Sequence, residues 1–210
     1  MSIRTIGILG AGKLGVVLAQ LALRSGYKVY ISGAGAKEDI ALTIEVLAPG
    51  AVAEVSEVVA HKADVVILAL PLSKFRNIPA NELKGKLVID SMNYWWEVDG
   101  ERSDILPDSM STSEAVQEFL AESRVVKAFN HMGYHDLLDE ARAKDAKGRK
   151  AIAVAGDDAR DVDAVSEIVD NLGFDPLYIG SLAMGKKLEA GAKVFGADET
   201  IDKLRQLIGS

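Results

Sequence analysis

The sequence predicts an α/β protein with a doubly wound, mostly parallel sheet and helices on both faces of that sheet. Short runs of β-branched residues alternate with segments of helical periodicity, which is typical of parallel sheets. A glycine-rich turn links the first such run to the first helical segment. Residues 63–70 are apolar almost without a break, as expected of a strand that helices cover on both sides.

The predicted elements begin with a buried strand at residues 3–9. Apolar residues from Leu14 to Leu21 then recur at the i, i+3, i+4, i+7 spacing of one helix face, and Gly26 stands where a glycine ends such a helix. The other predicted strands span residues 28–32, 51–54, 63–70, 86–90, 124–129, 151–155 and 177–179, and the other predicted helices span residues 38–47, 55–62 and 162–172.

Composition excludes several classes of protein. The chain has 210 residues, of which 49% are hydrophobic and 26% charged, so it can bury a core of its own. Its net charge of −7 argues against nucleic-acid binding and against a basic membrane-surface protein. It contains no cysteine, which excludes disulfides and thiolate chemistry. The apolar stretch at residues 5–23 carries Lys13 near its middle, so we expect no membrane span and a soluble, cytoplasmic protein.

The strongest motif is the sequence Gly-Ala-Gly-Lys-Leu-Gly at residues 10–15, which follows a buried strand and opens an amphipathic helix. In that context the motif predicts dinucleotide binding by a Rossmann-type fold. Gly10 makes the tight turn, Gly12 lets the backbone approach a pyrophosphate, and Gly15 lets the helix pack on the strand. The amides at the start of the helix then face the phosphates. The predicted cofactor-binding residues of this loop are Gly10, Gly12, Lys13, Leu14 and Gly15.

The end of the second strand favours NADP over NAD. An NAD site has Asp or Glu about 20 residues after the glycine motif, at the end of that strand. Here the strand ends in Ser32, Gly33 and Ala34, and no carboxylate precedes Glu38. We predict that the 2′-phosphate binds the Ser32 hydroxyl, the amides of Gly33 and Ala34, and Lys37. The loop contains no arginine.

We expect no separate substrate domain within residues 1–210. Residues 182–210 predict only one or two terminal helices, so we divide the chain into a nucleotide-binding domain at 1–181 and a helical extension at 182–210. No tyrosine has a lysine four residues on, which excludes the short-chain dehydrogenase pattern. The substrate therefore sits in the cleft of the nucleotide domain. Apolar residues in the extension predict a homodimer that uses it; they are Met184, Leu188, Val194 and Phe195.

Both tryptophans of the chain lie in residues 91–97, directly after the fifth strand. Ligands of parallel sheets bind at the carboxyl ends of strands, where this segment starts. Two interpretations stay open. Trp95 and Trp96 form either an aromatic plug on the sheet edge or a stacking wall for a planar second ligand.

The loop after the sixth strand carries two of the three histidines. His131 and His135 have the i, i+4 spacing of a metal pair, but no third ligand is evident, so we predict no metal. Contacts to the nicotinamide or the substrate, and hydrogen bonds within the loop, are the other interpretations. The aspartates within residues 157–163 stand where a helix begins, and we interpret them as helix-start charges.

Four segments together resemble a known family. They are residues 6–15, the strand 65–70 with Pro71 after it, Val-Val-Lys-Ala-Phe-Asn at 125–130, and Gly-Asp-Asp at 156–158. This pattern is similar to the coenzyme F420-dependent NADP oxidoreductases, a group that includes the cytosolic domain of the six-transmembrane metalloreductases. The resemblance implies one Rossmann-type domain with a small C-terminal extension, often dimeric. The family's deazaflavin reductases usually have Ser-Arg-Arg after the second strand, whereas Gly33 and Ala34 follow Ser32 here.

The resemblance also implies an activity, which is hydride transfer between NADPH and a flavin-like or deazaflavin ring such as coenzyme F420. Such a transfer needs proximity of two planar rings more than a positioned acid. An NADP-binding redox sensor without turnover and a reductase of small carbonyls or imines are the alternatives. The catalytic candidates are His131, His135 and Asn93. The further cofactor-binding candidates are Leu70, Pro71, Asn93 and Asn130.

Overall fold

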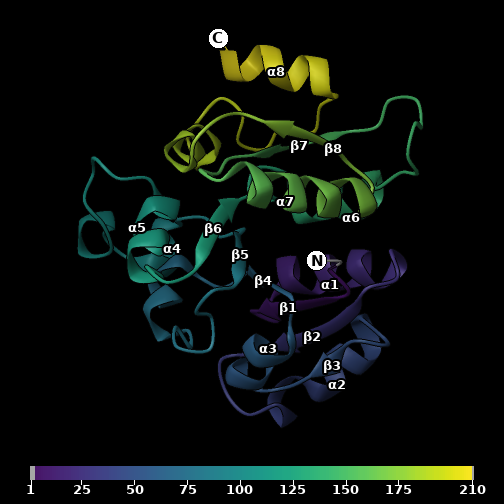
Figure 1. The fold of residues 1–210 in the computed structure, drawn as a ribbon, viewed down its shortest axis with the longest axis vertical. Coiled ribbons are helices and arrows are strands. Elements are labelled where there is room, and N and C mark those ends of the chain that lie inside the picture. The colour runs from purple at the N-terminus through teal and green to yellow at the C-terminus, as the bar shows by residue number, and fades with distance from the viewer. Residues whose placement is uncertain (1–2, 210) are drawn as a thin grey trace.

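The computed structural model describes residues 3–209 and places six parallel strands in one sheet, in the order β3-β2-β1-β4-β5-β6 (Figure 1). Every neighbouring pair runs parallel, so each connection between them crosses a face of the sheet. The doubly wound α/β fold that the sequence predicts is therefore confirmed. The strands are β1 (Thr5–Leu9), β2 (Lys28–Ser32), β3 (Val52–Ala53), β4 (Val65–Leu68), β5 (Leu87–Asp90) and β6 (Arg124–Lys127).

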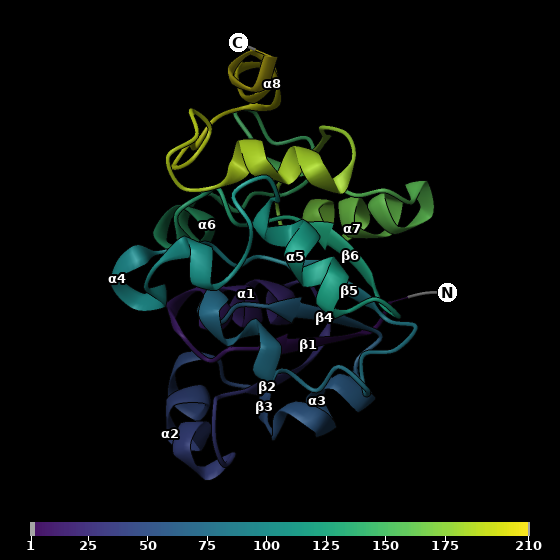
Figure 2. The ribbon, with the colours of Figure 1, turned by 90° about the vertical axis from the view of Figure 1, so that its left-hand side faces the viewer.

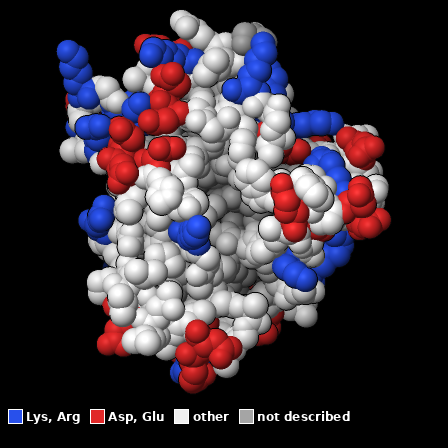
Figure 3. Space-filling view, turned by 180° about the vertical axis from the view of Figure 1, so that it is seen from behind, with Lys and Arg blue, Asp and Glu red and all other residues white. Residues whose placement is uncertain are grey.

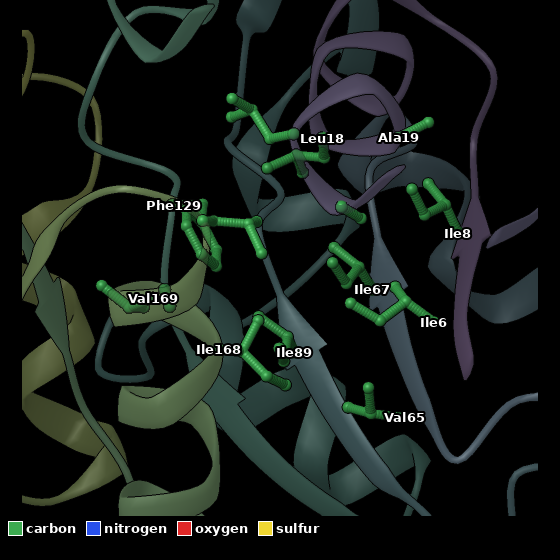
Figure 4. Close-up of a cluster of buried hydrophobic side chains, with 14 of the residues drawn as sticks. Ile6, Ile8, Leu18, Ala19, Val65, Ile67, Ile89, Phe129, Ile168 and Val169 are labelled. Carbon is green, nitrogen blue, oxygen red and sulfur yellow. The ribbon is translucent and has the colours of Figure 1, made fainter. Parts of the chain in front are cut away.

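Helices cover the two faces of this sheet with two separate apolar clusters. On one face of the sheet, side chains of β1 and β4 pack against α1. Figure 4 shows Ile6 of β1, Ile67 of β4 and Leu18 of α1 in this cluster. Phe129 and Ile168 extend the same cluster toward α7. The helices of this face are α1 (Lys13–Arg24), α2 (Glu38–Leu47), α6 (Tyr134–Glu140) and α7 (Ala159–Asn171), and those of the other face are α3 (Ser56–Lys62), the 3₁₀ helix η1 (Leu72–Asn77) and α5 (Thr112–Phe119).

The last two strands leave the main sheet. β7 (Ala151–Val154) and β8 (Asp175–Tyr178) form their own two-stranded parallel sheet, so the single sheet that the strand alternation suggests is wrong at this point. The chain has turned round between β6 and β7. Lys127 and Ala155 exchange two backbone hydrogen bonds of 2.8 and 3.0 Å in an antiparallel bridge, which joins only the ends of the two sheets.

The C-terminal segment packs on this small sheet. It contains the 3₁₀ helix η3 (Leu182–Leu188) and α8 (Ile201–Gly209), and α8 lies at the opposite end of the molecule from α2 (Figures 1 and 2). Leu188 and Val194 are buried with Ala153 of β7. Leu188 and Val194 therefore cover their own chain, whereas Met184 and Phe195 are only partly buried, and the homodimer stays a prediction. The division at 1–181 and 182–210 stays a prediction.

The start of α7 explains the run of aspartates. The Asp158 carboxylate accepts hydrogen bonds from the amides of Arg160 and Asp161, as an N-cap residue does. Asp157 accepts one from the amide of Leu182. These acids fix a helix end and the C-terminal segment. Across residues 3–209, none of the helices has the length and apolar character needed to cross a bilayer.

Candidate functional site

The glycine loop between β1 and α1 works by lacking side chains. Gly10 has φ +118°, and a Cβ there would overlap the Ala69 carbonyl at the end of β4. A Cβ on Gly15 would overlap the Gly10 carbonyl, so this glycine lets α1 start directly against the turn. A Cβ on Gly12 would meet no atom within 4 Å. Gly12 therefore faces open space, where a ligand can approach the backbone.

A cavity of about 540 Å³ lies beside this loop. Its walls come from the ends of β1, β2 and β4 and from η1, at the crevice where doubly wound folds bind nucleotides. Figure 3 shows that the face behind the view of Figure 1 is hollowed near its centre, with mainly uncharged side chains around the hollow. The lining residues are Leu9, Gly10, Ala11, Gly12, Ser32, Gly33, Ala34, Ile40, Ser56, Ala69, Leu70, Pro71, Lys74, Asn77 and Ile78.

Half of the twelve predicted cofactor residues line this cavity. The other six do not line it: Lys13, Leu14, Gly15, Lys37, Asn93 and Asn130. Lys13 turns its ammonium toward the Tyr134 ring, 5.5 Å from the ring centre. Leu14 packs against the apolar core under α1. Lys37 forms an ion pair of 3.8 Å with Glu54 and lines a different groove. The structure therefore does not bring Lys37 and Ser32 together in the one phosphate site that the sequence predicts.

Two asparagines join the ends of β5 and β6. Asn93 Nδ2 donates to the Asn130 carbonyl over 2.8 Å, and Asn130 Nδ2 donates to Asn93 Oδ1 over 3.0 Å. Asn130 also donates to the Leu188 carbonyl over 2.7 Å, which ties the C-terminal segment to this edge. The preceding residue, Phe129, is buried with φ +65°, a strained value for a non-glycine residue. Asn130 Oδ1 is buried and has no hydrogen-bond partner among the described residues.

Beneath the asparagines lies a buried polar network that sequence reasoning missed. The Lys127 ammonium lies 3.1 Å from Asp90 Oδ2 and donates to the Met92 carbonyl over 2.6 Å. Asp90 accepts further bonds from the Ser113 hydroxyl and the Met92 amide. Both charged side chains are fully buried. The sequence does contain a sign of this network. Lys127 lies within the apolar run of a predicted strand, and a lysine buried there requires a buried partner.

The tryptophan segment forms the outer wall of this region. Trp95 is 45% exposed and Trp96 69%, which favours the stacking wall over the aromatic plug. The Trp95 ring meets the Phe195 ring edge-on, with 5.5 Å between ring centres. The segment continues into α4 (Trp96–Asp99), where the Asp99 carboxylate accepts from the amides of Trp95 and Ser73. Figure 2 looks at the side toward which α4 and α5 project.

The two histidines do not come together. His131 is 1% exposed, and its Nε2 accepts a hydrogen bond of 3.0 Å from the Ala153 amide in β7. Burial lowers its pKa to about 4, so this histidine is neutral at pH 7 and holds the small sheet. This geometry gives His131 a structural role and does not favour it as a catalytic residue. His135 is exposed on α6 and stacks beside Tyr134. Within residues 3–209, no cluster of three or more metal-ligating side chains occurs.

Comparisons with known proteins find similarity to one family over residues 5–94. Residues 5–94 match the family model described as NADP oxidoreductase, coenzyme F420-dependent. The chain is 28% identical over 187 residues to the metalloreductase STEAP3 of Rattus norvegicus, covering 88% of this chain and 36% of that protein. The chain thus spans about a third of the length of that curated relative.

Solved structures share the fold. A hypothetical protein of Sinorhizobium meliloti matches with a TM-score of 0.80 and 22% identity, over 94% of this chain and 96% of that one. A protein of Arthrobacter sp. FB24, assigned as an F420-dependent NADP reductase, matches with a TM-score of 0.72 and 24% identity, over 88% of each chain. An imine reductase of Myxococcus stipitatus in complex with NADP⁺ matches with a TM-score of 0.62 and 17% identity, over 88% of this chain and 58% of that one.

The glycine loop, the crevice at the strand ends and the match over residues 5–94 all lie in the same half of the molecule. The resemblance that the sequence motifs indicate is confirmed: over residues 5–94 the chain matches the NADP oxidoreductase family described as coenzyme F420-dependent, and it is similar to a curated relative and to a solved structure over most of its length.

Proposed function

We propose that the protein is an NADPH-dependent oxidoreductase that transfers hydride between NADP(H) and a flavin-like or deazaflavin acceptor. The observation that carries the proposal is the cavity beside the glycine loop. Of the described residues that line it, none is a carboxylate, whereas Ser32 and Ser56 supply hydroxyls and Gly33 and Ala34 supply backbone amides. Such a lining favours a phosphorylated ribose over the free 2′-hydroxyl of NAD.

The residues present fit the cofactor. A Cβ on Gly12 would occupy the open space that a pyrophosphate needs, and the buried Asn130 Oδ1 lacks the donor that a carboxamide would supply. When bound, the nicotinamide supplies the hydride. The chain's own residues bind and orient: Leu70 and Pro71 border the cavity, and the Asn93–Asn130 pair holds the edge where β5 and β6 end.

The acceptor is proposed to lie against the tryptophan segment. Trp95 and Trp96 expose their rings at the carboxyl end of β5, and Phe195 from the C-terminal segment backs Trp95. Aromatic rings stack on planar ligands without requiring a specific polar group, so this wall suits a flavin-like ring. His131 supplies no proton there, because it is buried under β7.

The test is an anaerobic measurement of NADPH oxidation against a panel of deazaflavin, flavins, quinones and ferric chelates. We expect turnover with a deazaflavin or flavin, and faster turnover with NADPH than with NADH. Oxidation of NADPH by none of these acceptors, despite tight NADPH binding, would instead support a redox sensor without turnover.

A reductase of small imines or carbonyls is the second candidate. It is favoured by one observation, the exposed His135 at the start of α6, beside the Tyr134 ring that Lys13 contacts. In that case His135 acts as the acid, and its replacement by alanine costs the 10²–10⁴-fold typical of acid–base groups. A loss of about tenfold or less in the single-turnover rate supports ring-to-ring transfer instead.

The assembly and location of the protein remain predictions. We propose a homodimer in the cytoplasm, although Leu188 and Val194 are buried in the chain's own core and are not available to a partner subunit. Light scattering at micromolar concentration tests the dimer, and a monomer there contradicts it.

A further inference from the structure

We propose that Lys74, on the 3₁₀ helix after β4, is the cation that recognises the 2′-phosphate of NADP(H). The inference rests on the proposed function, because it assigns the phosphate contact in the same cavity. Neither the glycine motif nor the end of β2 points to this residue, since it lies more than 40 residues farther along the chain than Ser32. It answers the question that the arginine-free loop after β2 leaves open.

The cavity lining carries a single positive charge among the described residues. Lys74 is the one charged side chain among the described residues that line the cavity. Its ammonium makes no ion pair or hydrogen bond within residues 3–209, whereas Lys37 pairs with Glu54 and the Asp99 carboxylate accepts from the Ser73 amide. An unpaired cation beside hydroxyls and backbone amides, with no acid opposite, is a site for an anion.

The competing lysine, Lys37, lies among carboxylates. Lys37 is held by Glu54, and the groove that these two residues line also contains Glu38 and Glu45. Three carboxylates around one ammonium leave that groove negative, so a dianionic phosphate gains little there. Lys74 has no carboxylate beside it in the cavity lining.

The other residues that line the cavity with Lys74 offer apolar surface and hydroxyl groups. Ile40 and Ile78 line the same cavity and provide apolar surface of the kind that an adenine ring covers. The Ser32 side chain is buried and its oxygen accepts a hydrogen bond of 3.1 Å from the Ser56 hydroxyl, which leaves the Ser32 hydroxyl hydrogen to donate. A phosphate beside these serines is bound by a hydroxyl from β2 and by a cation from η1.

The experiment compares three alanine variants by calorimetric titration with NADPH, NADH, 2′,5′-ADP and ADP. Lys74→Ala tests the inference, Lys37→Ala tests the competing lysine, and Lys84→Ala is the surface control. Lys84 pairs with Glu122 and is exposed, away from the cavity. Far-ultraviolet circular dichroism checks that each variant is folded, which we expect because all three side chains lie at the surface.

We expect Lys74→Ala to weaken NADPH and 2′,5′-ADP about tenfold, as loss of one charge-assisted contact does, while NADH and ADP change less than twofold. The preference of the wild type for 2′,5′-ADP over ADP should also decrease as the salt concentration rises. This salt dependence should be weaker in Lys74→Ala. Lys37→Ala and Lys84→Ala should leave all four affinities within twofold.

Two results overturn the inference, and they differ from each other. If the wild type prefers NADPH but Lys74→Ala keeps that preference, another group binds the phosphate and only the role of Lys74 fails. If the wild type binds NADH as tightly as NADPH, the cofactor preference of the proposed function fails, and the inference fails with it.

Discussion

The loop between β1 and α1 and the edge where β5 and β6 end both follow the carboxyl ends of strands in one sheet, but they are built differently. In the first region glycines remove side chains, so that backbone amides are free for a ligand. In the second, the buried side chains of Asp90 and Lys127 bind each other and the surrounding backbone. The first region can therefore lose its ligand and keep its fold, whereas the second cannot lose a side chain without losing stability.

The largest expected effect is on the buried ion pair. Lys127→Met leaves the Asp90 carboxylate buried with no cation, and removal of one partner of a buried pair costs about 3–5 kcal/mol of unfolding free energy. Urea unfolding measures it. The double variant Asp90→Leu with Lys127→Met should regain part of the loss, because no charge is then left alone. A loss below about 1 kcal/mol in Lys127→Met would show that this edge tolerates change as the glycine loop does.

The next effect concerns pH and the histidine under β7. Burial lowers the pKa of His131 to about 4, so between pH 4 and its unfolded value near 6.5 the unfolded chain binds more protons than the folded one. The free energy of unfolding should therefore hold above about pH 6.5 and fall by about 3 kcal/mol as the pH drops to 4.

Urea unfolding of the wild type and of His131→Gln across pH 4–8 checks this dependence. The variant should lose that part of the slope, since glutamine can accept the Ala153 amide hydrogen bond without titrating. If the free energy of unfolding falls equally steeply with pH in the two proteins, carboxylates and not His131 cause the loss of stability at low pH.

Gly12→Val tests the opposite region. Its side chain enters open space, so the fold should persist while NADPH affinity falls about 100-fold through lost contacts to charged oxygens. Calorimetry and thermal unfolding report the two quantities separately. Gly10→Ala is the matched variant, and it should lower the unfolding temperature, because φ +118° disfavours alanine and the Ala69 carbonyl blocks its Cβ. Unchanged NADPH affinity in folded Gly12→Val would remove the dinucleotide site from this loop.

The smallest expected effect is at the aromatic wall. Trp95→Ala should raise the acceptor KM by roughly 2–10-fold, the equivalent of one lost stacking contact, and leave the Kd of NADPH unchanged. Steady-state kinetics with the best acceptor of the panel measures the first and calorimetry the second. An equal loss of NADPH affinity would place Trp95 in the cofactor site instead.

The two regions also differ in how far the sequence predicts them. The strand at residues 28–32 and the helix at 38–47 match β2 and α2 at both ends, because periodicity and turn residues mark these elements locally. The helix α5 was missed although Ser111 and Glu114 form a readable capping box at its start. No local signal predicts the Asp90–Lys127 contact, since it depends on strand register across 37 residues. Lys37 was predicted from its nearness in sequence to Ser32, but an ion pair with Glu54 turns it away.

The Asp99 carboxylate has a kinetic consequence. One oxygen accepts from the Ser73 amide in η1, the 3₁₀ helix that borders the cofactor cavity, and the other accepts from the Trp95 amide in the tryptophan segment. We therefore expect a cofactor that contacts η1 to position the tryptophan segment as well, before any acceptor arrives. We expect turnover to be sequential with NADPH as the leading substrate and NADP⁺ as the last product released, and product-inhibition patterns to show this order in the wild type and a random order in Asp99→Ala.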